Sequence, residues 1–185
     1  MSVFNKFSLL LFLLIAFGCG SNKQVPSTTA QIEDLNALVS NKSFVINVNT
    51  ARPLATGTVS RVANAGLLPP GSNVGRIDLT GMSSFLRVVK DSVTANLPYY
   101  GERQISAPYN SKNTGVRFDG IPQDFEISPN EKTSGYTVQF RIRSGTEAFD
   151  VSAELLPDLS STININSTHR TAIWYNGSVA KYSSE

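Results

Sequence analysis

The sequence has one cysteine and one histidine among its 185 residues. One cysteine excludes an intramolecular disulfide, and one cysteine with one histidine cannot supply the four ligands of a usual zinc site. Charged residues make up 16% of the chain, against about 25% in an average domain, and the formal net charge is +2. A net charge this small does not indicate the basic surface patch that a nucleic-acid-binding protein needs. We therefore expect no metal, cofactor or nucleic-acid partner. The low share of charged residues also favours a β-rich envelope or extracellular protein.

The sequence also lacks the common catalytic signatures GxSxG, GxGxxG, HExxH and the P-loop. Asp119 with Asp124 or Glu126 could form the carboxylate pair of a hydrolase. However, Asp124 and Glu126 alternate with Phe125 and Ile127, which is typical of an exposed strand. We predict that the protein is not an enzyme, and an envelope hydrolase is the least favoured interpretation.

The start of the chain contains a short apolar run between one lysine and the cysteine. Lys6 precedes an apolar block, Phe7 to Phe17, with the layout of a secretory signal peptide. The block is shorter than the roughly 20 residues that a membrane-spanning helix needs. The residues at the end of this block, Ala16-Phe17-Gly18-Cys19, resemble the lipobox at which bacterial lipoproteins are cut before an acylated cysteine. We predict a signal peptide over residues 1–18 and a lipid anchor at Cys19; cleavage that leaves a soluble protein with a free thiol is the alternative.

The residues after the cysteine predict a tether and a destination. Residues 19–27 are polar and end near Pro26, as in a flexible linker. Gly20, in place of Asp, resembles the signal that releases a lipoprotein to the outer membrane, and no acidic pair resembling a surface-export signal follows it. We therefore expect a lipid-anchored protein of the outer membrane, on its periplasmic face rather than at the cell surface.

A helix is expected at the start of the folded domain. Thr28 and Gln31 fit a capping box, and Leu35 and Val39 fall on one helical face. These features predict a helix over residues 28–40.

From Phe44 onward the apolar period changes from about 3.6 to 2. Short apolar segments then recur every 8 to 12 residues or so, with turn residues between them. We predict a single all-β domain over residues 41–182, an antiparallel meander that forms a sandwich or barrel-like sheet, with only the one N-terminal helix. Within the least regular region, residues 51–74, Thr58 to Val62 could form a strand.

One hairpin can be predicted with its register. Apolar residues alternate from Tyr136 to Ile142 and again from Phe149 to Leu155. Both apolar faces meet one core only if Ile142 pairs with Phe149, and this register leaves Gly145-Thr146 as a two-residue loop. Gly at the first loop position is what a type II′ turn requires. The same register pairs Arg141 with Asp150 on the solvent side.

Several blocks of the sequence follow the order of one known family. They are Leu97-Pro98-Tyr99-Tyr100-Gly101, Ala107-Pro108-Tyr109, Gly115-Val116-Arg117-Phe118-Asp119-Gly120, and His169-Arg170 with Ile173-Trp174-Tyr175-Asn176-Gly177. The set resembles an uncharacterised bacterial envelope lipoprotein family, domain of unknown function 4251, from about Phe44 to Val179. The resemblance implies an exported lipoprotein with a β-rich domain, without an assigned activity or catalytic residues.

Aromatic residues within these blocks are the candidate binding residues. Pro98 and Pro108 cannot donate to a sheet ladder, so the segment between them is expected to cross one end of the sheet as a loop. Aromatic faces stack on sugars or lipids while offering a polar edge. The residues of a possible ligand or partner rim are Tyr99, Tyr100, Tyr109, Trp174 and Tyr175. Packing in or beside the core is the alternative role for all of them.

Together these features predict a non-enzymatic outer-membrane lipoprotein that binds a ligand or supports an envelope assembly. Its partners would be the membrane, through the acylated Cys19, and an unknown envelope protein or small ligand. The alternative is a carrier that encloses a lipid or glycan in a barrel-like pocket. A fully packed interior would argue against the carrier.

Overall fold

The computed structural model describes residues 27–105 and 114–183. In chain order the elements are α2 (Thr29–Ser40), β1 (Ser43–Pro53), α3 (Gly57–Asn64), β2 (Ile77–Asp78), β3 (Phe85–Val89), β4 (Ser92–Leu97), β5 (Val116–Gly120), β6 (Gln123–Asn130), β7 (Gly135–Ser144), β8 (Glu147–Leu155), β9 (Ser160–Ser167) and β10 (Ile173–Lys181). The predicted signal peptide, Cys19 and most of the tether lie outside the described residues. Within the described part, no helix is long and apolar enough to cross a membrane.

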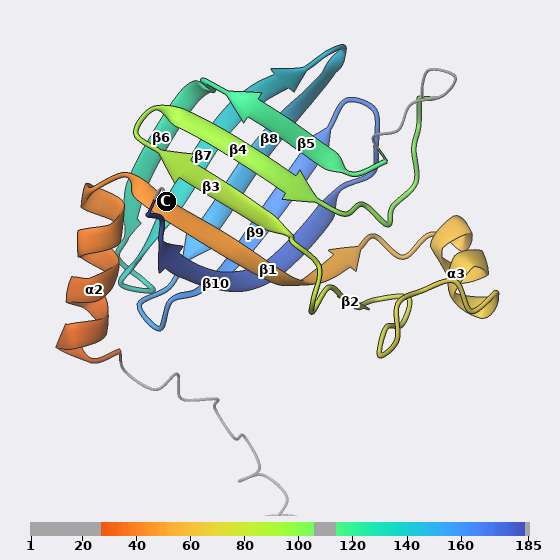
Figure 1. Ribbon diagram of the computed structural model, residues 1–185, viewed down its shortest axis with the longest axis horizontal. Coiled ribbons are helices and arrows are strands. Elements are labelled where there is room, and N and C mark those ends of the chain that lie inside the picture. Colours follow the sequence, from red (N-terminus) through yellow and green to blue (C-terminus); the bar gives the residue numbers. More distant parts are fainter. Residues whose placement is uncertain (1–26, 106–113, 184–185) are drawn as a thin grey trace, which may run out of the picture.

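All the strands belong to one antiparallel sheet that curls into a half-barrel (Figure 1). The strand order is β5-β4-β3-β1-β10-β9-β8-β7-β6, with the short β2 paired to β1. The chain therefore forms two meanders, β3 to β5 and β6 to β10, and β1 joins them by pairing with both β3 and β10. The predicted all-β antiparallel fold is confirmed.

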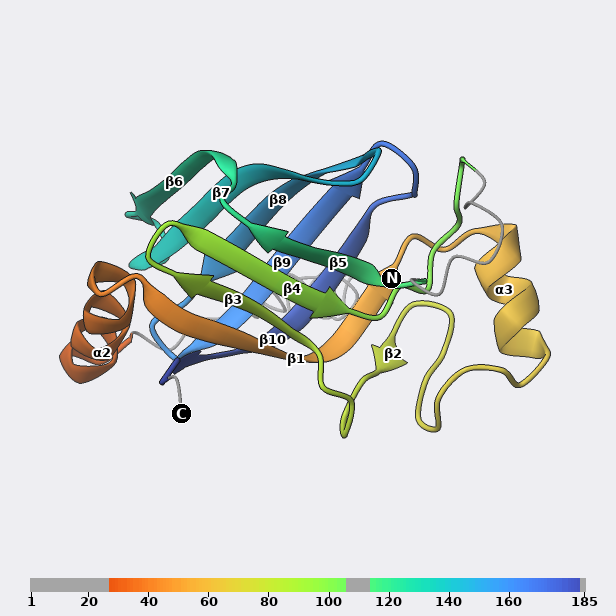
Figure 2. The ribbon, with the colours of Figure 1, turned by 45° about the horizontal axis from the view of Figure 1, so that its top comes forward.

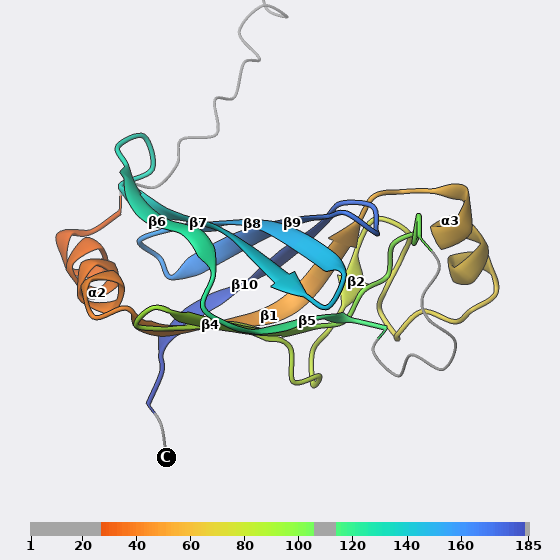
Figure 3. The same ribbon diagram turned by 90° about the horizontal axis from the view of Figure 1, so that it is seen from above.

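The curl places the two meanders opposite each other as two layers (Figure 3). The segment Ile121–Pro122 connects their outermost strands, β5 and β6. Between the layers, the ring of Phe118 on β5 lies 5.9 Å from that of Phe140 on β7 and 5.7 Å from that of Phe149 on β8, centroid to centroid. These three rings, all at most 4% exposed, fill the space where the two meanders face each other.

The helix α2 covers one open end of this curled sheet (Figure 2). The predicted capping box is present, since the Thr28 hydroxyl accepts a hydrogen bond from the backbone N–H of Gln31 and the Gln31 side chain accepts one from the Thr28 N–H. Leu35 and Val39 are buried in the core, as predicted. The hydroxyl of Tyr136 on β7 also donates to the side chain of Asn36, 2.9 Å away.

A second helix, α3, replaces the strand that the sequence suggested at Thr58 to Val62, so the prediction of a single helix is wrong. The β-branched residues there favour a strand, but the segment finds no neighbouring strand to pair with. Instead, the Thr56 hydroxyl caps the helix by accepting from the N–H of Val59, 3.3 Å away. Val59 is the one buried residue of α3, which lies at the opposite end of the molecule from α2 (Figure 1).

The β7–β8 hairpin has the predicted register. Ile142 pairs with Phe149 and Ser144 with Glu147, which leaves Gly145 and Thr146 as the loop. Gly145 has a φ of 62°, as the first position of a type II′ turn requires. Arg141 and Asp150 form the expected cross-strand ion pair, with 2.6 Å between Nε and Oδ1.

Candidate functional site

The structure separates the aromatic residues that the sequence grouped into one rim. Trp174 and Tyr175 are neighbours on β10 and therefore point to opposite faces of the sheet. Tyr175 is fully buried inside, whereas Trp174 lies half-buried on the outer face. Tyr109 lies outside the described residues. Trp174 and Tyr175 therefore do not lie on one rim, because the period of a strand places adjacent residues on opposite faces.

Tyr99 and Tyr175 hold the loop at one end of the sheet in place. The Tyr175 hydroxyl donates to the carbonyl oxygen of Pro98 at 2.8 Å, and the Tyr99 hydroxyl lies within 3.0 Å of the carbonyl oxygens of Glu102 and Thr171. Burial raises the pKa of both phenols. Tyr100 packs partly buried against the same core. These contacts favour the anchoring role for Tyr99 and Tyr175 over a ligand rim.

Beside this loop lies a buried ion pair that the sequence analysis did not single out. Arg170 donates from Nε and Nη2 to the two carboxylate oxygens of Glu147, at 2.6 and 2.9 Å, and from Nη1 to the carbonyl oxygen of Thr114. Ser167 donates to the same carboxylate, and the guanidinium lies 5.0 Å from the centre of the Tyr99 ring. Every oxygen of Glu147 is thus occupied. A detectable signal was the position of Glu147, two residues before Phe149 on the inward-facing period of its strand.

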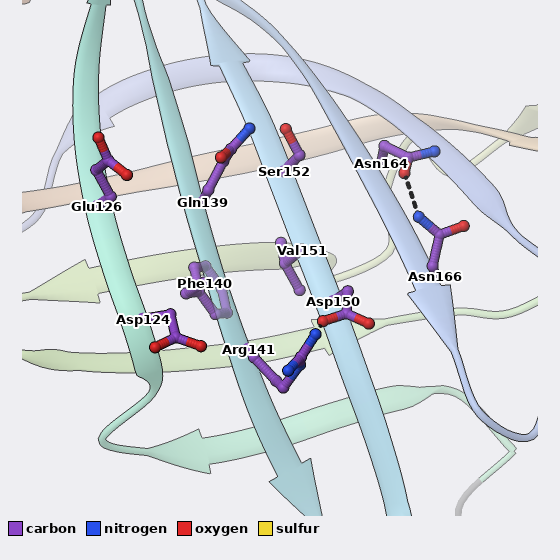
Figure 4. A pocket seen from close by; sticks show the side chains of 10 residues that line it. All are labelled: Asp124, Glu126, Gln139, Phe140, Arg141, Asp150, Val151, Ser152, Asn164 and Asn166. Carbon is purple, nitrogen blue, oxygen red and sulfur yellow. Dashed lines mark hydrogen bonds and ion pairs between the residues drawn. The ribbon is translucent and has the colours of Figure 1, made fainter.

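A different surface, on the outer face of the sheet, carries a hollow lined mainly by polar side chains. The outer face of β6 to β9 carries a hollow of about 330 Å³. It is lined by Asp124, Glu126, Gln139, Phe140, Arg141, Asp150, Val151, Ser152, Asn164 and Asn166 (Figure 4). The carboxylates, amides and hydroxyl on this face point away from the core, while the phenylalanine and valine belong to the packed interior below. The sequence indicated that Asp124 and Glu126 lie on an exposed strand face and that Arg141 pairs with Asp150, but it did not bring these residues together as one surface.

A bulge in the edge strand β6 brings two carboxylates to the hollow. The pairing with β7 shifts between Gln123 and Glu126, so β6 contains one extra residue there. Asp124 takes a φ of 53° at this bulge, a conformation that costs a non-glycine residue about 1 kcal/mol or more. As a result, Asp124 and Glu126 both face the hollow (Figure 4), while Phe125 turns inward towards Phe140.

Glu126, Gln139 and Ser152 stand side by side at the centre of this surface. Their strands pair Glu126 with Gln139 and Gln139 with Ser152, and the row continues through Asn164 on β9 to Trp174 on β10. No hydrogen bond from another described residue reaches the side chains of Glu126, Gln139 or Ser152. With about 4.8 Å between neighbouring strands, the row is about 19 Å long.

The outer face of the opposite meander is organised differently. There, Arg87 donates to the hydroxyls of Tyr182 and Thr94, and Thr94 donates to Asp119 at 2.7 Å. The amide of Asn96 donates to the carbonyl oxygen of Ser83. These polar side chains are hydrogen-bonded within the protein, in contrast to Glu126, Gln139 and Ser152 at the centre of the hollow.

The same arrangement removes the geometric basis for the proposed hydrolytic pairs. Asp119 lies on the outer face of β5 with Thr94, whereas Asp124 and Glu126 lie on the outer face of β6. These faces point away from each other because the two layers of the curled sheet enclose the core between them (Figure 3). Over residues 27–105 and 114–183, no three metal-ligating side chains form a cluster that could hold a metal ion.

Comparisons with known proteins identify a family. The family model described as "Domain of unknown function (DUF4251)" matches residues 27–179 of the chain. Among solved structures, the chain is similar to a DUF4251 family protein from Bacteroides eggerthii DSM 20697, with a TM-score of 0.54 and 17% sequence identity. That match covers 82% of this chain and 88% of the other, and at this identity it shows a shared fold. The curated proteins include no match.

Proposed function

The chain belongs to the DUF4251 family, and from that premise we propose that it is a lipid-anchored, non-enzymatic binding module of the bacterial envelope. Its binding surface is the hollow on the outer face of β6 to β9. The observation that carries this proposal is the central trio of Glu126, Gln139 and Ser152, whose polar groups no other described residue satisfies. A ligand that supplied matching groups would gain hydrogen bonds without displacing any within the protein.

The packed interior supports binding on the outside. Phe118, Phe140 and Phe149 occupy the space that a carrier would keep for a lipid or glycan. A ligand pocket of the usual size, about 300–1,000 Å³, would require these rings to move apart. This argues against the carrier interpretation.

The membrane anchor rests on the lipobox-like exit at Cys19. Growth with an alkyne-labelled fatty acid, followed by intact mass measurement, tests it directly. We expect the wild-type chain to begin at an acylated Cys19 and the Cys19→Ser variant to carry no label. A mature chain with an unmodified Cys19 would refute the anchor but leave the binding surface open to its own test.

Site-specific photocrosslinking in intact cells tests the binding surface. A photoreactive amino acid replaces Gln139 in the hollow or, as the matched control, Asn96 on the outer face of β4. We expect a discrete crosslinked species from position 139 and none from position 96. Equal crosslinking from both positions, or none from position 139, would overturn the assignment of this surface.

A further inference from the structure

We infer that the ligand of the outer-face hollow is a neutral, hydroxyl-rich oligosaccharide chain. This inference rests on the proposed function, because it takes the hollow as the binding surface. It is carried by three properties of the site: the types of its polar groups, its charge, and the tryptophan at the end of its central row.

The polar groups match the chemistry of sugar hydroxyls. Each hydroxyl both donates and accepts, so neighbouring hydroxyls are best bound by amides, which do both, and by carboxylates, which accept two O–H groups. Gln139 presents an amide without a partner in the described chain. The amide of Asn166 donates to that of Asn164 at 2.9 Å, which fixes both planes and leaves the Asn164 amino group and the Asn166 oxygen for a ligand (Figure 4).

The charge of the hollow selects a neutral sugar. Its lining has three carboxylates, Asp124, Glu126 and Asp150, against one guanidinium, that of Arg141, and this guanidinium is already paired with Asp150. A phosphate or uronate would be repelled by the two carboxylates at the bulge, Asp124 and Glu126. The two apolar side chains of the lining, Phe140 and Val151, are at most 4% exposed, so neither offers a surface to a lipid chain.

Trp174 supplies the flat apolar surface that a sugar ring needs. It lies in the same row as Gln139, Ser152 and Asn164 and is half-buried beside the exposed Arg52. An indole face packs on the C–H face of a pyranose, while its N–H can still donate a hydrogen bond. The length of the row, about 19 Å across five strands, suits several linked sugars better than one.

Trp174 also makes the test simple, because it is the only tryptophan in the chain. The mature lipoprotein is studied in a detergent without a sugar headgroup, such as lauryldimethylamine oxide. The probes are cello-, xylo-, malto- and chito-oligosaccharides, the neutral polysaccharide released from the producing cells, and oligogalacturonate as the anionic comparison. Tryptophan emission and titration calorimetry report binding.

We expect at least one neutral probe to change the Trp174 emission and to bind with measurable heat. Gln139→Ala and Trp174→Ala should each weaken this binding by about tenfold. Asn96→Ala, which removes an amide from the outer face of β4, should leave the affinity unchanged. Because the Trp174→Ala variant has no tryptophan emission, its affinity is measured by calorimetry alone.

Three results would overturn the inference: no neutral probe binds, oligogalacturonate binds better than the neutral probes, or binding is unaffected by both hollow variants. The photocrosslinking experiment separates this failure from that of the proposed function. A protein crosslinked from position 139, without saccharide binding, would keep the binding surface and refute the sugar. Neither crosslink nor saccharide binding would refute both.

Discussion

At the scale of single residues, Glu147 and Arg170 are charged side chains that are almost completely buried. Their side chains are 10% and 5% exposed and satisfy each other through two hydrogen bonds. Removing one partner leaves the other buried without its counterion. We expect Arg170→Met to lower the free energy of unfolding by about 3–5 kcal/mol and the double variant Arg170→Met, Glu147→Leu to recover most of the loss. Urea denaturation of the two variants measures this, and a double variant no better than the single one would contradict it.

The same pair predicts how stability depends on pH. Burial alone would raise the pKa of Glu147, but the hydrogen bonds from Arg170 and Ser167 and the positive charges of Arg170 and Arg103 lower it overall. Because the pKa of Glu147 is lowered in the folded state, its ionised carboxylate contributes fully to the free energy of unfolding above the ordinary glutamate pKa of about 4.3. This contribution is lost as the pH falls through the pKa of the folded state. We expect the stability difference between wild type and Glu147→Gln to shrink between about pH 5 and pH 3. A constant difference would show that the pKa of Glu147 is the same in the folded and unfolded states and would contradict the prediction.

At the scale of elements, the β7–β8 hairpin depends on one backbone conformation. Gly145 has a positive φ, and a Cβ added there would meet no atom within 4 Å. Gly145→Ala should therefore cost about 1–2 kcal/mol through backbone strain alone. Gly57, at the start of α3, also has open space around it but no positive φ. Gly57→Ala is the control and should leave the thermal midpoint unchanged or slightly raised.

The pairing of β1 with β10 depends on a glycine for a different reason. A Cβ on Gly177 would collide with the carbonyl oxygen of Asn47 and lie 3.0 Å from the Cα of Val48. Backbone atoms in the centre of a sheet cannot move aside cheaply, so Gly177→Ala should destabilise the protein more than Gly145→Ala. In the Gly177→Ala variant, amide hydrogen exchange should be accelerated relative to wild type more in β1 and β10 than in the other strands. An exchange pattern equal to that of Gly145→Ala would contradict this reason for the glycine.

For the whole molecule, the interior is expected to be closed to apolar ligands. Phe118→Ala would remove the ring that contacts Phe140 and Phe149 across the two layers, at a cost of about 3–5 kcal/mol. The variant should bind the fluorescent probe N-phenylnaphthylamine in the resulting space, and the wild type should not. Strong binding of the probe by the wild type would contradict the closed interior and favour the carrier interpretation.

The parts of this molecule that could be predicted from the sequence are those in which local chemistry and apolar period agree. The capping box of α2 and the turn at Gly145 are of this kind, because neighbouring residues alone determine them. The helix α3 was missed because β-branched residues favoured a strand that had no partner. The hollow was missed because Glu126, Gln139 and Ser152 come from three strands, and only the pairing register brings them into one row.

The position of β1 has a consequence for how this chain becomes a folded protein. The first strand pairs with the last one in the middle of the sheet, so the contact that unites the two meanders has a very large sequence separation. Folds dominated by such contacts form slowly. The two meanders cannot unite until β10 is available, after all the other strands of the sheet have been synthesised. Such a delay would suit a chain that must stay unfolded while it crosses a membrane, as the signal peptide predicted at residues 1–18 would require.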